Sequence, residues 1–129
     1  MIKREAHFTV TFRHWLMANP MPSSAFELKQ TTTDSIPFSS VQEHQIDALL
    51  TVSQGVKGLL YKAPDDSRGV KPCDLLYLRN AMAYVVIKYP KMFAIISIGH
   101  FLFEKEKSKR KSLTADRARE IASRVVALK

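Results

Sequence analysis

The sequence predicts an α/β fold in which a central mixed β-sheet is flanked by helices. Apolar residues recur at helical spacing near both ends of the chain and once in between. Between the second and the last of these patterns, residues 56–98 contain four short apolar or β-branched segments separated by turn residues. A helix, a strand, a helix, several strands and a closing helix are typical of a sheet covered by helices.

Residues 1–129 are expected to form a single domain, because a chain of this length builds one hydrophobic core. No segment has the length and hydropathy of a membrane span, and the first residues lack the apolar stretch of a secretory signal. Cys73 is the single cysteine, which excludes an intrachain disulfide framework and fits a reducing compartment. We therefore expect a cytoplasmic protein that does not bind a membrane.

The first helix is expected over residues 3–18, although the β-branched residues 9–11 leave a strand as the alternative. Its apolar stripe comprises Phe8, Phe12, Trp15 and Leu16. Prolines predict a loop over residues 19–24, and a candidate strand follows over residues 25–33. The sequence Asp-Ser-Ile-Pro-Phe then predicts a turn at residues 34–38.

The second helix is expected over residues 40–53, with Ser40 and Glu43 forming an S-x-x-E capping box. Four strands are expected next, at residues 58–62, 73–78, 83–89 and 93–98. An exposed loop is predicted at residues 63–69 and a flexible charged run at residues 104–111. The last helix is expected over residues 114–128, with Thr114 as its cap.

Glu27-Leu28-Lys29 is the motif that points to chemistry. In a strand, residues i and i+2 project from the same face, so Glu27 and Lys29 would lie side by side. A carboxylate suits Mg²⁺ or Mn²⁺, and an adjacent lysine can orient water or stabilise charge on a phosphate. These are the parts that phosphodiester hydrolysis needs. Alternating Glu and Lys on a solvated strand is the alternative, since E-x-K alone is a weak signal.

The surrounding segment resembles the RecU and Hjc Holliday-junction resolvases of the PD-(D/E)xK nuclease superfamily. The likeness is carried by the E-x-K strand, the polar turn at residues 34–38 and the helix that opens with His44-Gln45. Arg110-Lys-Ser-Leu also resembles the family's Lys-Ser-Ile/Leu stretch before its last helix. The resemblance covers residues 26–58 well and the rest loosely. It implies a restriction-endonuclease-like fold, Mg²⁺ or Mn²⁺ as cofactor, and branched DNA such as a four-way junction as substrate.

The family places an aspartate on a strand just before its E-x-K motif, and residues 19–25 contain no acidic residue. By elimination, Asp74 is the favoured second metal ligand beside Glu27, with a turn-closing role as the alternative. Asp65 and Asp66 are reserve candidates, and Glu5 is a further candidate metal ligand or a plain solvated residue.

Gln45 falls on the apolar face of its helix, where a buried amide needs hydrogen-bond partners. A polar site under the helix would supply them, as would the backbone. In the family that this segment resembles, a glutamine on this helix borders the active site. The resemblance therefore adds Gln45 to the catalytic candidates Glu27 and Lys29. His44 is interpreted as a surface or capping residue.

The chain carries 20 Lys and Arg against 12 Asp and Glu, a formal net charge of +8. This excess favours a polyanionic partner, and nucleic acid is the commonest in the cell. The candidate phosphate contacts are Lys105, Lys107, Lys109, Arg110, Lys111 and Arg117. A solvated loop and helix face is the alternative.

The sequence therefore predicts a Mg²⁺- or Mn²⁺-dependent endonuclease that cuts branched DNA. Because a junction presents two strands for symmetric cutting, we expect a homodimer. The alternative is a DNA-binding protein on a degenerate nuclease fold. An RNA-binding module is disfavoured, because no aromatic RNP-like strand or glycine clamp is visible. The short length would suit an enzyme encoded by a phage of a bacterial host.

Overall fold

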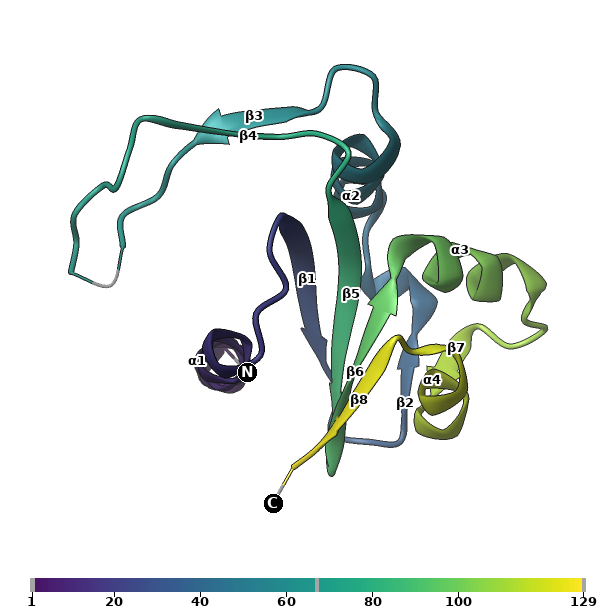
Figure 1. The fold of residues 1–129 in the computed structure, drawn as a ribbon. Coiled ribbons are helices and arrows are strands. Elements are labelled where there is room, and N and C mark those ends of the chain that lie inside the picture. The colour runs from purple at the N-terminus through teal and green to yellow at the C-terminus, as the bar shows by residue number, and fades with distance from the viewer. Residues whose placement is uncertain (1, 67, 129) are drawn as a thin grey trace.

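A four-stranded mixed sheet forms the centre of the computed structural model, which describes residues 2–66 and 68–128, with side chains from residue 7 onward. The strand order is β1-β5-β6-β8 (Figure 1). β1 (Ser24–Gln30) runs parallel to β5 (Met82–Tyr89), whereas β6 (Met92–Ser97) and β8 (Arg124–Ala127) continue the sheet antiparallel. This confirms the prediction of a mixed sheet with flanking helices.

Helices cover both faces of this sheet. α1 (Ile2–Ala18) packs on one face, and α2 (Glu43–Gln54), α3 (Ile98–Lys107) and α4 (Ala115–Ile121) lie on the other (Figure 1). Successive residues of β5 alternate between the two core clusters: Tyr84 and Val86 face α1, whereas Val85 and Ile87 face α2 and α3. Burial on both faces explains why residues 83–87 of β5 form an unbroken apolar run.

The turn predicted at residues 34–38 is instead a short strand followed by a single helical turn. β2 (Ser35–Pro37) pairs antiparallel with β7 (Ser112–Thr114), and a 3-10 turn spans Phe38–Ser40. Tyr89 joins this small ribbon to the main sheet, because its buried hydroxyl donates a hydrogen bond of 3.0 Å to the Leu113 carbonyl. β1 also ends three residues earlier than predicted, at Gln30 rather than residue 33.

The two strands expected at residues 58–62 and 73–78 do not join the central sheet. Among the residues that the structure describes, β3 (Leu59–Lys62) and β4 (Leu75–Leu78) pair only with each other. With their connecting loop they form an arm that projects from the body on the β1 side (Figure 1). Gly58 stands at its base with φ +75°, and a Cβ there would lie 2.7 Å from the Leu78 carbonyl oxygen. This tight crossing requires glycine and determines where the arm leaves the body.

The C-terminal segment differs most from its prediction. The helix expected over residues 114–128 ends at Ile121, although Thr114 caps it as predicted by accepting from the Arg117 amide. Ser123 then donates its backbone N–H to the Ile95 carbonyl, and β8 pairs along β6. Residues 124–127 thus pair with the otherwise open edge of β6 and do not continue the helix that their periodicity predicts. The charged run at residues 104–111 is also partly helical, because α3 extends to Lys107.

None of the helices in the described residues combines the length and the hydropathy needed to cross a membrane.

Candidate active site on β1 and α2

Glu27 and Lys29 project from the β1 face that α2 covers. Phe26 and Leu28 pack into the cluster under α1, so the residues between them point to the opposite face. Lys29 Nζ lies 3.5 Å from Glu27 Oε2, and the two side chains are 19% and 27% exposed. The predicted juxtaposition is therefore present, with a half-buried ion pair that remains accessible to a ligand.

Gln45 connects this pair to the start of α2. Its Nε2 donates to Glu27 Oε2 over 3.0 Å, and its Oε1 accepts from the backbone N–H of Gln42 over 2.9 Å. The predicted Ser40–Glu43 capping box is wrong, since the N-cap lies two residues later, at Gln42. Gln45 is thus both a capping residue and a hydrogen-bond donor to the candidate catalytic carboxylate.

A hollow of about 340 Å³ opens beside these side chains, between β1, α2 and the base of the arm. Glu27, His44 and Gln45 supply its polar wall, while Ala48, Leu49 and Leu59 supply much of its apolar wall. His44, interpreted from the sequence as a surface residue, is exposed and lines this hollow. Its place beside Gln45 in the sequence was the signal that could have indicated this.

The donor atoms of the cluster are compatible with a divalent cation. Gln45 and Lys29 both contact Oε2 of Glu27, which leaves Oε1 of this hard carboxylate for a ligand. The Gln45 amide oxygen is engaged by the helix cap and its NH₂ faces the carboxylate, so Gln45 orients Glu27 and is not itself a ligand. Mg²⁺ commonly uses one or two protein carboxylates and completes its shell with water and substrate phosphate. Glu27 fits such a site.

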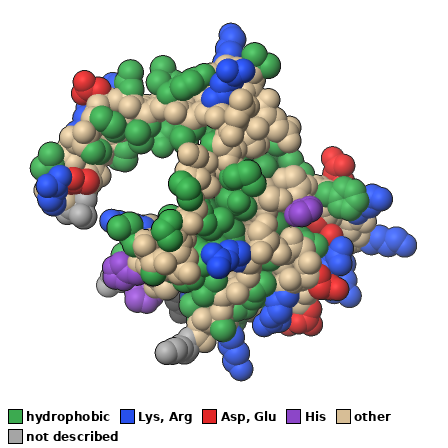
Figure 2. All heavy atoms as spheres, viewed as in Figure 1, with side chains coloured by type: hydrophobic (Ala, Val, Ile, Leu, Met, Phe, Trp, Pro, Cys, Tyr) green, Lys and Arg blue, Asp and Glu red, His purple; other side chains and the backbone are tan. Residues whose placement is uncertain are grey.

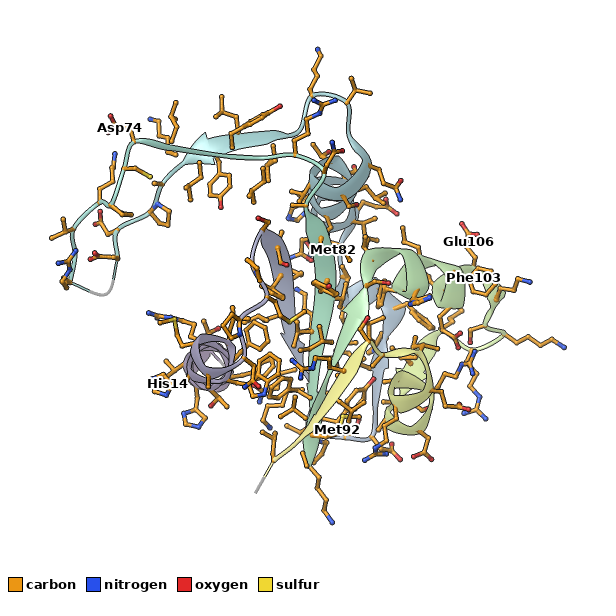
Figure 3. The ribbon with its side chains drawn as sticks, viewed as in Figure 1. His14, Asp74, Met82, Met92, Phe103 and Glu106 are labelled. Carbon is orange, nitrogen blue, oxygen red and sulfur yellow. The ribbon has the colours of Figure 1, made fainter. Side chains whose placement is uncertain are left out.

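The other predicted acids lie elsewhere or outside the described side chains. Asp74 is exposed just before β4, on the outer part of the arm and away from β1 (Figure 3). The expectation that its strand neighbours β1 is wrong. Asp66 organises the arm loop by accepting hydrogen bonds from the Arg68 guanidinium and from the Val70 and Arg68 amides, and these bonds, the guanidinium first, lower the pKa of its carboxyl group. Asp65 is exposed in the same loop, and Glu5 belongs to α1 but its side chain lies outside those described.

No group of three or more His, Cys, Asp or Glu side chains that could hold a metal ion is found within the described part of the chain.

Some of the predicted phosphate-contacting residues interact with other side chains of the protein, and others are exposed. Arg117 makes two hydrogen bonds of 2.8 and 3.0 Å to the buried carboxylate of Glu104, and this pairing raises the pKa of Arg117. Lys107 lies 5.0 Å above the Phe103 ring, and Lys105 is half-buried. Lys109, Arg110 and Lys111 are exposed. Figure 2 shows Lys and Arg mixed with Asp and Glu on this side of the molecule.

A search of known protein family models finds none that matches the chain, and a search of curated proteins also finds no match.

Proposed function

We propose that this chain is a divalent-metal-dependent nuclease that hydrolyses DNA phosphodiesters at the Glu27–Lys29–Gln45 cluster, with branched DNA as its substrate. The observation that carries this proposal is that Lys29 from β1 and Gln45 from α2 both contact one carboxylate oxygen of Glu27. The E-x-K spacing, the resemblance to junction resolvases and the net charge of +8 support it.

Each of the three residues has a separate task in this proposal. Glu27 would hold Mg²⁺ or Mn²⁺, which would supply Lewis-acid activation of the phosphate and of water when bound. The Lys29 ammonium, 3.5 Å from the carboxylate, can stabilise negative charge that develops on the phosphate oxygens or hold the attacking water. Gln45 keeps the carboxylate in one orientation, because its amide is itself held by the Gln42 backbone.

Two substitutions test the proposal. Glu27→Ala and Lys29→Ala should each reduce cleavage of a labelled four-way junction by at least about 100-fold, the usual effect of removing one transition-state contact. Junction binding, measured by gel shift, should be nearly unchanged. Matched controls are Glu43→Gln, an exposed carboxylate on α2, and Lys88→Ala, a half-buried lysine on the neighbouring strand. Full nicking activity in either site variant would refute the assignment.

A DNA-binding protein without catalytic activity is the second candidate. It is favoured by the position of Asp74, because the chain does not bring this second predicted carboxylate to Glu27. The same assay separates the two candidates. A protein that binds junctions with normal salt dependence and leaves them uncut with Mg²⁺ and with Mn²⁺ would be the binding protein.

A further inference from the structure

The arm exposes an unusually apolar surface for a two-stranded ribbon. Leu60, Leu75 and Tyr77 are 61%, 56% and 57% exposed, respectively. We call the exposed large apolar side chains of the arm and its base the arm patch: Val56, Leu60, Tyr61, Val70, Leu75, Leu76, Tyr77 and Met82. An isolated two-stranded ribbon is at best marginally stable in water. The arm patch therefore indicates a surface that another protein covers.

The arm patch reaches the size of a protein interface when both faces of the arm are covered. Leu60, Leu75 and Tyr77 lie on one face of the ribbon, and Tyr61 and Leu76 lie on the other. At about 100 Å² for each half-exposed large side chain, the whole patch, counted over both faces, amounts to on the order of 800 Å². A standard specific interface buries roughly 800 Å² on each partner. Nucleic acid is a poor occupant, because phosphates are bound by cationic and polar groups rather than by leucine, valine and tyrosine side chains.

A complementary feature lies on the same side of the molecule. β1 pairs with β5 along one edge, and within the described residues no strand pairs with its other edge. The arm and α1 both stand on this open side, and Figure 2 shows a notch between them with hydrophobic side chains along the arm. An open edge strand is a template for an added strand. The described residues thus place a projecting ribbon and an unpaired strand edge on the same side of the molecule.

The arm of one copy can cover the open β1 edge of a second copy if the two copies are related by a twofold axis. Each copy can lay its arm across the open β1 edge of the other, next to the α2 face that carries Glu27, so that the same contact occurs twice. The arm leaves the body at a defined point, because Gly58 and the hydrogen bond from the Tyr77 hydroxyl to the Lys57 carbonyl hold its base. It is therefore suited to reach a neighbour rather than to fold back.

We propose that two copies of this chain exchange their arms, and that Asp74 of one copy completes the metal site at Glu27 of the other. The part of this inference that concerns the metal rests on the proposed function. Asp74 immediately precedes β4, at the end of the ribbon remote from Gly58 (Figure 3). Its carboxylate makes no hydrogen bond or ion pair with the side chains and backbone that the structure describes. Glu27 offers one carboxylate oxygen, and a second acid from the arm would supply the other protein ligand that such sites commonly use.

The first experiment measures the mass of the protein by sedimentation velocity. The wild type should be a dimer, and Leu75→Glu should be a monomer. This substitution places a carboxylate opposite Lys62 in the β3–β4 register, which keeps the arm itself intact. The matched control is Phe103→Glu, because Phe103 is equally exposed on α3, far from the arm (Figure 3). A wild-type monomer, or a Leu75→Glu dimer, would overturn the arm exchange.

The second experiment tests the shared site by mixing two inactive variants. Glu27→Ala and Asp74→Asn should each fail to bind Mn²⁺ in titration calorimetry. After they are unfolded and refolded together in equal amounts, half of the dimers carry one intact site. Mn²⁺ binding should then return at about a quarter of the wild-type stoichiometry. Sites built within one chain would give no recovery, and that result would overturn the inference.

The two proposals fail in different ways. Recovery of Mn²⁺ binding in mixed dimers that leave every DNA uncut would refute the nuclease and keep the shared site. Cleavage and Mn²⁺ binding by a monomeric Leu75→Glu protein would refute the shared site and keep the nuclease.

Discussion

Gln45→Ala should destabilise the protein by about 2 kcal/mol. Loss of the cap to the Gln42 amide accounts for about 1 kcal/mol. A hydrogen bond to a charged group contributes about 1.5–3 kcal/mol, but the 27% exposure of Glu27 lets water replace much of it, which leaves about 1 kcal/mol. For a chain of this length the Tm should fall by roughly 8 °C.

Gln45→Glu separates the two tasks of this residue. A glutamate at the third helical position still accepts from the Gln42 amide and adds favourable charge at the helix N-terminus. It also replaces the donor 3.0 Å from Glu27 with a second carboxylate. The loss of stability should therefore be about half that of Gln45→Ala, and added Mn²⁺ should raise the Tm of Gln45→Glu by more than that of the wild type. Equal destabilisation in urea titrations followed by circular dichroism would refute the capping role.

Three further predictions concern the rest of the molecule. Burial raises the pKa of Tyr89 above its ordinary value, so the folded protein keeps a proton that the unfolded chain releases. The free energy of unfolding should then fall as pH rises above about 10, and urea titrations of Tyr89→Phe should show a weaker fall. Phe93→Ala should cost about 3–5 kcal/mol by urea titration, because its buried ring contacts Phe8, Phe12 and Trp15. If the exposed Lys109, Arg110 and Lys111 contact phosphates, replacing all three with Gln should reduce the slope of log K against log salt by about 2–3, and an unchanged slope would exclude this surface.

The sequence alone was enough to predict those helices and strands whose residue pattern agrees with their environment in the fold. β5 was evident from its apolar run, because burial on both faces permits no polar residue in the middle of the strand. The same-face position of Glu27 and Lys29 followed from the two-residue period of a strand, which holds wherever the strand pairs. The helical stripe of α1 also placed Phe8 and Phe12 in the core correctly.

Only the tertiary structure decided which elements become partners, because periodicity describes the chain's own geometry and not its neighbours. Residues 124–127 carry a helical pattern, yet they pair with β6, where an open sheet edge offers a full set of hydrogen bonds. β3 and β4 read as central strands, but Gly58 turns them out of the body, and Asp74 moves away from Glu27 with them. Gln45 lay on the correct helix face, whereas its hydrogen bond to Glu27 depends on how α2 crosses β1.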